Sequence, residues 1–131
     1  MSEGSVLKLA DARIEIIAGE RRGLSINLDE PRLIIGRELD CGLQLPDDLC
    51  SRHHAVILCD EYTVRIRDLG SRNGTFVNGM QIQSTTILNE FDKVRIGHTT
   101  MAIRRNYSNE FSPTAETRTD AIAPEQTKIL F

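Results

Sequence analysis

Short segments in which apolar and polar residues alternate constrain the fold of this chain more than any other feature of its sequence. Apolar residues recur at every second position in segments 24–28, 64–67, 93–97 and 101–103. Successive side chains of a strand point to opposite faces, so each segment is predicted to be a strand with one buried face. Segments 14–18, 33–35 and 55–59 are denser apolar runs, which are typical of strands buried on both faces.

Turn residues separate these segments. Asn78-Gly79 lies between two short runs and predicts a hairpin, because a type I′ turn needs positive φ at both central residues. Glycine, proline, asparagine and aspartate also separate the other runs. No segment carries a sustained apolar stripe of helical period. Many short strands with frequent turns and almost no helix predict an all-β protein, either a sandwich or a barrel.

The chain length and a change in composition predict the domain organisation. A chain of 131 residues fits one domain that buries its own hydrophobic core. After about Asn106 the sequence contains two prolines, four threonines and scattered acids, with no periodicity before Ile129. We therefore expect a flexible arm over residues 1–12, a β-domain over residues 13–106 and a flexible tail over residues 107–131.

Charge and cysteine content narrow the classes of partner and location. The formal net charge of -3 argues against a broad electrostatic contact with nucleic acid. Three cysteines without close pairs, and a start that resembles no export signal, favour a reducing, cytoplasmic setting. No apolar stretch approaches the roughly 18 residues of a membrane span. We therefore expect neither a nucleic-acid partner nor a membrane partner.

Four loop motifs beside the predicted strands are rich in hydrogen-bond donors. In chain order they are Gly36-Arg37, Ser51-Arg52-His53-His54, Asp68-Leu69-Gly70-Ser71-Arg72-Asn73-Gly74-Thr75 and Val77-Asn78-Gly79. They offer guanidinium groups, hydroxyls, an amide and the backbone N–H groups of glycines. Such a set suits an anion with several acceptor oxygens, and phosphate is the obvious candidate.

In this order and spacing the motifs resemble the pattern of the forkhead-associated (FHA) domain family. That pattern is Gly-Arg, Ser-x-x-His, Ser-x-Asn-Gly-Thr and Asn-Gly, and the resemblance covers roughly residues 14–104. Each motif alone is weak, whereas the four together in a strand-rich sequence are specific. The resemblance implies a β-sandwich of about eleven strands that binds phosphothreonine peptides through loops between strands. It implies a signalling adaptor and not an enzyme, with no catalytic residue, cofactor or metal.

The resemblance also assigns the peptide contacts position by position. Arg37 matches the arginine that pairs with the phosphate, and Ser51 matches the serine whose hydroxyl and backbone N–H reach it. Asn73 matches the asparagine that holds the peptide backbone. Arg52 lies where members often have a further contact. Arg72 departs from the pattern, because many members have a small hydroxyl residue there, and its role stays open between side chain, backbone and no contact.

Other motif residues are expected to shape the loops. His54 matches a histidine that braces the loops from behind without touching ligand. The resemblance implies architectural roles for Gly36, Gly74, Thr75, Asn78 and Gly79.

Two hypotheses concern the peptide. Leu49 occupies a position that in many members reads the third residue after the phosphothreonine, which predicts an apolar preference there. The tail holds accessible threonines suited to a kinase, and Thr119, or otherwise Thr117 or Thr127, is a candidate phosphosite. Because some family members are switched by self-binding, the phosphorylated tail is a candidate ligand of its own domain or of a second copy.

The expected partner is a phosphothreonine-containing protein, either a substrate of a Ser/Thr kinase or the kinase itself. Two alternatives stay open at this point. One is a phosphate-independent docking domain, against which the presence of Arg37, Ser51 and Asn73 argues. The other is a hydrolase of an anionic substrate that uses Cys50 with His53 or Asp68 with His54. The spacing of the cysteines and histidines lacks the short pairs typical of zinc sites.

Overall fold

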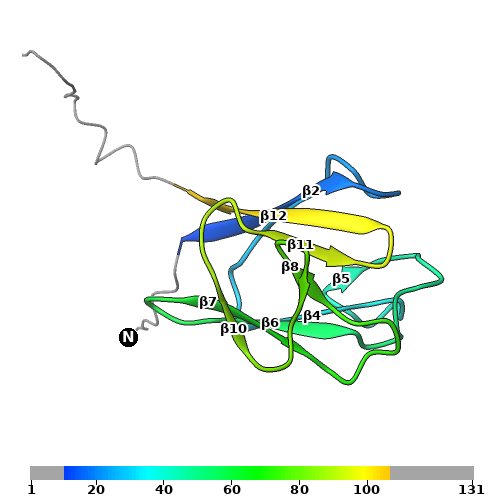
Figure 1. Cartoon of the computed structure of the whole chain (residues 1–131). Helices are drawn as coiled ribbons and strands as arrows, with labels where there is room; N and C mark the ends of the chain where they lie inside the picture. Colours follow the sequence, from blue (N-terminus) through cyan, green and yellow to red (C-terminus); the bar gives the residue numbers. More distant parts are fainter. Residues whose placement is uncertain (1–10, 107–131) are drawn as a thin grey trace, which may run out of the picture.

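A computed structural model describes residues 11–106, which form eleven strands in two sheets. The six-stranded sheet has the order β3 (Ser25–Asn27), β2 (Ala12–Ala18), β12 (Thr99–Arg105), β11 (Lys93–Ile96), β8 (Phe76–Val77) and β9 (Met80–Gln81). The five-stranded sheet has the order β10 (Thr86–Leu88), β7 (Val64–Asp68), β6 (Ala55–Cys59), β4 (Arg32–Gly36) and β5 (Leu43–Gln44). Figure 1 shows the two sheets stacked as layers. The predicted all-β sandwich is confirmed.

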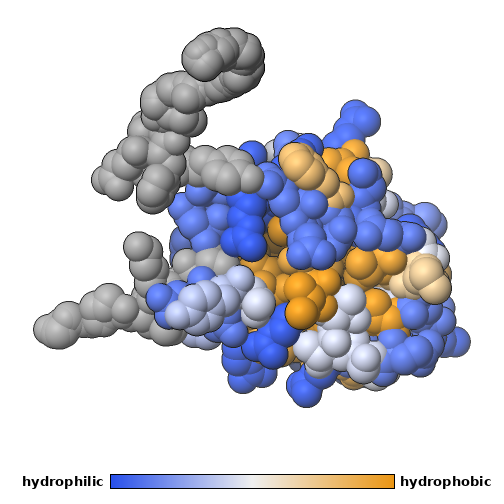
Figure 2. Space-filling view, turned by 60° about the vertical axis from the view of Figure 1, so that its left-hand side comes forward, coloured by the Kyte–Doolittle hydropathy of each residue, from blue (hydrophilic) through white to orange (hydrophobic). Residues whose placement is uncertain are grey.

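The alternating segments form strands because one side of each reaches the core. In β11 the residues alternate exposed and buried, with Val94 and Ile96 fully buried. The register places Val94 opposite Met101 and Met101 opposite Ile16, so these side chains form one row on the inner face. On the facing sheet Ile57 lies opposite Ile66, and both are fully buried. Figure 2 shows apolar side chains in a band between hydrophilic regions, where the layer between the sheets reaches the surface.

The prediction of strands buried on both faces is right for segment 55–59 and wrong for segment 14–18. In β6 four of five residues are buried, including Val56 on the outer face. In β2 buried and half-buried residues alternate. The outer face of β2 carries Glu15, whose carboxylate accepts a hydrogen bond from Arg104 of β12 at 2.9 Å. An ion pair beside water replaces the apolar cover that the prediction assumed.

The predicted hairpin at Asn78-Gly79 is confirmed. Val77 of β8 pairs with Met80 of β9 across a two-residue turn. Asn78 and Gly79 have φ of 51° and 86°. Asparagine and glycine are the residues that adopt positive φ most readily, so the local sequence alone determines this turn.

The described residues bear on the ends of the predicted domain only in part. β2 begins at Ala12, one residue before the predicted start of the domain, and Asn106 still donates its backbone N–H to Asp11. The candidate phosphosites Thr117, Thr119 and Thr127 lie outside the described residues. Across residues 11–106 no helix is long and apolar enough to cross a membrane.

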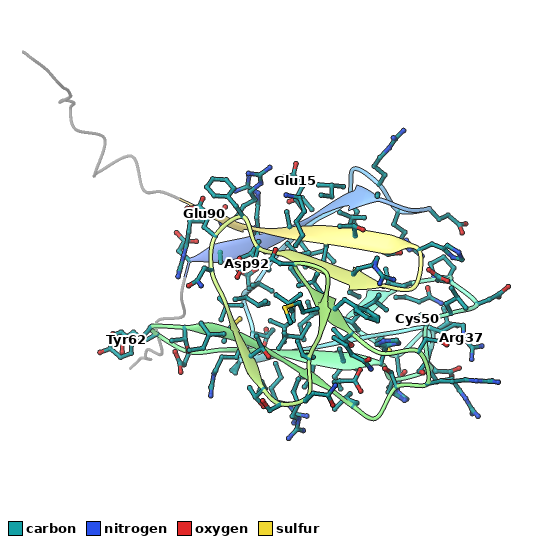
Figure 3. All side chains as sticks on the ribbon, viewed as in Figure 1. Glu15, Arg37, Cys50, Tyr62, Glu90 and Asp92 are labelled. Carbon is teal, nitrogen blue, oxygen red and sulfur yellow. The ribbon has the colours of Figure 1, made fainter. Side chains whose placement is uncertain are left out.

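Strand direction places the first three loop motifs at one end of the sandwich. β6 is antiparallel to both β4 and β7, and β5 is parallel to β4. The loop after β4, the loop between β5 and β6 and the loop after β7 therefore meet at one end of the five-stranded sheet. Figure 3 shows Arg37 and Cys50 together at this end, with Tyr62 and Glu90 at the opposite end.

Candidate functional site

A shallow pocket lies where these loops meet. It is lined by Arg37, Asp48, Leu49, Cys50, Ser51, Arg72 and Asn73. These residues come from three loops, namely those between β4 and β5, between β5 and β6, and between β7 and β8. The structure therefore brings together five residues that the sequence assigned to peptide binding and adds Asp48 and Cys50.

Arg37 enters the pocket with its guanidinium group partly fixed. Its Nε donates to the carbonyl of Cys50 at 3.0 Å, and its backbone N–H donates to the carbonyl of Ser51 at 3.0 Å. This arrangement leaves the terminal nitrogens of the guanidinium group free to donate to a ligand. Among the described residues Arg37 forms no ion pair, and the nearby carboxylate of Asp40 pairs with His53 at 3.1 Å.

Ser51 and Arg72 meet across the pocket. The backbone N–H of Arg72 donates to Oγ of Ser51 at 3.0 Å, so the Ser51 hydroxyl keeps its proton for another acceptor. The backbone N–H of Ser51 donates to Nδ1 of His54 at 3.0 Å. This N–H is therefore already engaged by His54, and the hydroxyl is the group of Ser51 that is open to a ligand.

His54 ties two loops together from inside the protein. It is fully buried, and its Nε2 lies 2.9 Å from the carbonyl of Gly74. Because the N–H of Ser51 can only donate, Nδ1 must accept, and Nε2 must carry the proton that it donates to Gly74. The neutral ring therefore uses both nitrogens to hold the loop after β5 against the loop after β7.

Asp68 organises the loop between β7 and β8. One carboxylate oxygen accepts the backbone N–H groups of Gly70 at 2.9 Å and Ser71 at 2.8 Å. The other accepts the hydroxyls of Ser71 at 2.5 Å and of the fully buried Thr75 at 2.7 Å. Partial burial acts to raise the pKa of Asp68, but the hydrogen bonds from Ser71, Thr75 and Gly70 outweigh it and hold the pKa below its ordinary value.

Asn73 is fixed at one nitrogen and open elsewhere. Its Nδ2 donates to the carbonyl of Leu49 at 3.0 Å, so the amide oxygen and the second N–H remain to bind a peptide backbone. Leu49 itself is 40% exposed and lines the pocket. The residue expected to read the peptide sequence therefore lies directly beside the residue expected to hold its backbone.

Arg52 is the proposed contact that the structure does not bring to the pocket. Its side chain is exposed and is not among the pocket residues. Its carbonyl accepts the N–H of Glu38 at 3.3 Å and the thiol of Cys41 at 3.3 Å. A Cβ on Gly36 would lie 2.1 Å from that carbonyl oxygen, so this crossing of two backbones requires glycine.

The remaining motif residues lie in the scaffold. Gly74 has φ of +90°, and a Cβ there would lie 2.6 Å from Nε2 of Gln81. Asn78 accepts the N–H of Lys93 at 3.0 Å and donates to Asp92 at 3.0 Å. These contacts hold the β8–β9 hairpin against β11, away from the pocket lining.

The thiols and histidines do not form a catalytic arrangement. Burial raises the pKa of Cys50 to about 11, so its thiol stays protonated near neutral pH. His54 lies 3.9 Å from Asp68, but both of its nitrogens already bind backbone groups. Neither pair considered for a hydrolase therefore presents a free nucleophile and base.

One group among the described residues has the side chains that a metal ion could use. Asp40, Cys41 and His53 place their ligand atoms within 4.8 Å of one another. Burial, followed by the neighbouring charge of Asp40, raises the pKa of Cys41, which disfavours the thiolate that a metal requires. The thiol instead donates to the carbonyl of Arg52.

Sequence reasoning missed three residues of the site. Asp48 and Cys50 line the pocket, and Asp47 anchors the loop that carries them. In the sequence Asp47 and Asp48 indicate only a turn, and Cys50 suggests only the thiol of a hydrolase and not a residue that lines a binding pocket. The signal that identifies them is their position immediately before Ser51, within the segment that both Arg37 and Asn73 contact.

Comparison with known proteins agrees with this geometry. The profile of the FHA domain family matches residues 33–97. The FHA domain-containing protein FhaA of Mycobacterium tuberculosis is 38% identical over 82 residues, which are 63% of this chain and 15% of that protein. The glycogen accumulation regulator GarA of Mycolicibacterium smegmatis is 33% identical over 101 residues, which are 73% of this chain and 63% of that protein. The chain thus spans less than two thirds of the length of either relative.

A solved structure has the same fold as this chain. An FHA domain described in a structural and functional analysis of phosphothreonine-dependent FHA domain interactions superposes with a TM-score of 0.67 at 31% identity. The match covers 74% of this chain and 98% of that domain. With three of its four loop motifs placed at one end of the same sandwich, this chain belongs to the FHA domain family.

Proposed function

We propose that this chain is a phosphothreonine-dependent protein-interaction domain that acts as a signalling adaptor. The observation that carries the proposal is the charge state of the pocket. Arg37 and Arg72 line it together with one carboxylate, that of Asp48, and within residues 11–106 neither guanidinium group forms an ion pair. In a chain of net charge -3, two unneutralised cations beside a free hydroxyl favour an anionic ligand.

Each pocket residue then has a role. The phosphate carries about -1.5 to -2 charges at pH 7 and accepts hydrogen bonds from the terminal nitrogens of Arg37 and the hydroxyl of Ser51. Asn73 binds the backbone of the peptide beside the phosphothreonine through its free amide groups. Arg72 adds positive charge at the rim. An unmodified threonine offers a single hydroxyl to the same donors, so binding depends on phosphorylation.

The family context supports binding without catalysis. Relatives of this chain include a regulator, and the protonated Cys50 and fully engaged His54 offer no nucleophile and base. The partner in this proposal is a phosphothreonine-containing protein, a kinase substrate or the kinase itself. Cys41, Cys50 and Cys59 are free thiols, which agrees with the predicted cytoplasmic location.

Self-binding through residues 107–131 is a second part of the proposal. The segment contains Thr117, Thr119 and Thr127, with an apolar residue three positions after each of the latter two. A random coil of about 25 residues has a root-mean-square span of roughly 25–30 Å, and a span of that length suffices to reach a pocket on the same domain or on a second copy. Arg37 and Ser51 would then bind the phosphorylated tail in competition with a partner.

The test is a fluorescence-anisotropy titration with phosphothreonine peptides selected by the full chain from an oriented library. Arg37→Ala removes a contact worth on the order of 2–5 kcal/mol, which weakens binding about thirtyfold or more at about 1.4 kcal/mol per tenfold. Arg67→Ala, an exposed arginine of β7 outside the pocket, is the matched control and keeps wild-type affinity. Equal binding of phosphorylated and unmodified peptides would refute the proposal and favour a phosphate-independent docking domain.

A further inference from the structure

Asp47 places a buried carboxylate between the two sheets at the pocket end of the sandwich. Its side chain is 7% exposed, and it lies in the loop between β5 and β6 of the five-stranded sheet. One oxygen accepts the backbone N–H of His98 at 2.6 Å, and the other accepts the backbone N–H of Leu49 at 2.9 Å. Nδ1 of His98 lies 3.2 Å from the latter oxygen. Because His98 belongs to the β11–β12 turn of the six-stranded sheet, this one side chain links both sheets.

The β11–β12 turn is shaped to receive this carboxylate. A Cβ on Gly97 would lie 2.6 Å from Oδ2 of Asp47 and 2.9 Å from its Cγ. Gly97 also has a backbone φ of +59°, which residues other than glycine rarely adopt. The turn therefore admits Asp47 only because residue 97 has no side chain.

The segment that Asp47 holds supplies the carbonyls that orient the pocket. The backbone N–H of Cys50 donates to the backbone carbonyl of Asp47 at 2.9 Å, and this hydrogen bond closes the turn before Ser51. Within that turn the carbonyl of Leu49 accepts Nδ2 of Asn73, and the carbonyl of Cys50 accepts Nε of Arg37. The directions of Arg37 and Asn73 therefore depend on where residues 49 and 50 lie.

We infer that Asp47 is a positioning residue for phosphopeptide binding, which is anchored to the six-stranded sheet through His98 and acts on the pocket through Leu49 and Cys50. The inference rests on the proposed function and assigns Asp47 no contact with the ligand. Partial burial acts to raise the pKa of Asp47, but the hydrogen bonds from Leu49 and His98 outweigh it and hold the pKa below its ordinary value, so the link is ionised near neutral pH.

The test compares Asp47→Asn with Asp92→Asn. Asp92 is a matched control because it also accepts a backbone N–H, from Asn89 at 2.7 Å, and a side chain of another loop, Asn78. Figure 3 places Asp92 well away from Arg37. The carboxylate of Asp47 accepts hydrogen bonds from the backbone N–H groups of Leu49 and His98. Asparagine would turn an N–H₂ group toward one of these two donors, and that hydrogen bond would be lost. We expect about tenfold weaker binding of the selected phosphothreonine peptide by Asp47→Asn, which corresponds to about 1.4 kcal/mol, and unchanged binding by Asp92→Asn.

A second measurement separates positioning from a general loss of stability. In NMR spectra of the peptide-free protein, the Nε–H signal of Arg37 and the Nδ2 signals of Asn73 should shift or broaden in Asp47→Asn and stay in place in Asp92→Asn. Gly97→Ala, which pushes on the carboxylate from the other sheet, should reproduce both effects if Asp47→Asn fails to fold. His98→Ala keeps the backbone donor and should change affinity less than threefold.

Two results would overturn the inference. One is wild-type affinity of a folded Asp47→Asn protein with unshifted Arg37 and Asn73 signals. The other is an equal loss of affinity in Asp92→Asn at a temperature where both variants are folded. The NMR comparison needs no peptide, so it tests positioning by Asp47 even if no phosphothreonine peptide binds and the proposed function itself fails.

Discussion

Removing the carboxylate of Asp68 should lower the free energy of unfolding, by an amount set by how deeply the donors that lose their acceptor are buried. Asp68→Ala leaves the backbone N–H groups of Gly70 and Ser71 and the hydroxyls of Ser71 and Thr75 without this partner. Gly70 is exposed, so water replaces the carboxylate there, whereas Thr75 is fully buried. An unsatisfied buried donor costs about 1–3 kcal/mol, and the lost charged hydrogen bond to Ser71 adds a similar amount, so we expect a loss of about 3 kcal/mol.

Asp68→Asn should cost less, for a reason that the same geometry gives. Asparagine keeps one oxygen, which can accept the backbone N–H groups of Gly70 and Ser71. Its N–H₂ group then faces the hydroxyls of Ser71 and Thr75, which can rotate and accept. We expect a loss of about 1 kcal/mol, the value of an ordinary net hydrogen bond.

The difference between the wild type and the alanine variant should shrink in acid. Because the folded pKa of Asp68 lies below the ordinary carboxyl value, the folded protein binds a proton at this group less readily than the unfolded chain. The stabilisation is therefore complete above the unfolded pKa of about 3.9 and is lost as the pH falls through the folded pKa.

Urea denaturation followed by circular dichroism, at neutral pH and below pH 4, measures all three quantities. Equal losses in the alanine and asparagine variants would show that the two hydroxyls do not adapt to an amide at position 68. A difference between wild type and alanine variant that stays constant into acid would show that the charge of Asp68 contributes nothing. The first result would refute the expected adaptation of the two hydroxyls, and the second would refute the role of Asp68 as the charged acceptor that organises this loop.

Three further predictions concern the site. Gly36→Ala should unfold the protein or lower its melting temperature sharply in calorimetry, because the new methyl group meets the carbonyl of Arg52 at 2.1 Å. Gly79→Ala is the control with a smaller expected effect, because its methyl group meets nothing within 4 Å and only its positive φ is strained. Leu49→Arg should change the preferred third residue after the phosphothreonine from apolar to acidic in a peptide library, and an unchanged profile would show that residue 49 does not read this position. Kinase-treated full chain should bind a selected phosphopeptide several-fold more weakly than a kinase-treated variant with Ala at all three candidate threonines of residues 107–131, and equal affinities would dispose of self-binding.

The parts of the fold and site that the sequence predicts are those decided by neighbours in the chain. The Asn78-Gly79 hairpin follows from the φ values that these two residues tolerate. The meeting of Arg37, Ser51 and Asn73 follows from motif order once the strands before and after them are known to pair. Each inference uses information spread over a few residues, and the structure agrees with each.

Predictions fail where the answer depends on what lies across a strand or on the other side of a loop. The expectation of full burial for β2 fails because Glu15 meets Arg104, a residue 89 positions away. The expected contact of Arg52 stays a prediction, because its exposed side chain is not among the pocket residues and its carbonyl occupies the space that Gly36 leaves. A motif gives the position of a residue but not the direction of its side chain.

Hydrogen bonds behind the pocket hold its binding side chains in place before a ligand arrives. Nε of Arg37 and Nδ2 of Asn73 each donate to a carbonyl of the segment before Ser51, and His54 holds that segment against the following loop. Side chains fixed in this way lose little conformational entropy when a ligand arrives, and more of the charge-assisted binding energy is retained as affinity. The affinity of the pocket is therefore expected to depend on residues such as Asp47, which are joined to it only through backbone carbonyls. That dependence could not be predicted from the sequence, because Asp47 and His98 are 51 positions apart and nothing local to either indicates the other.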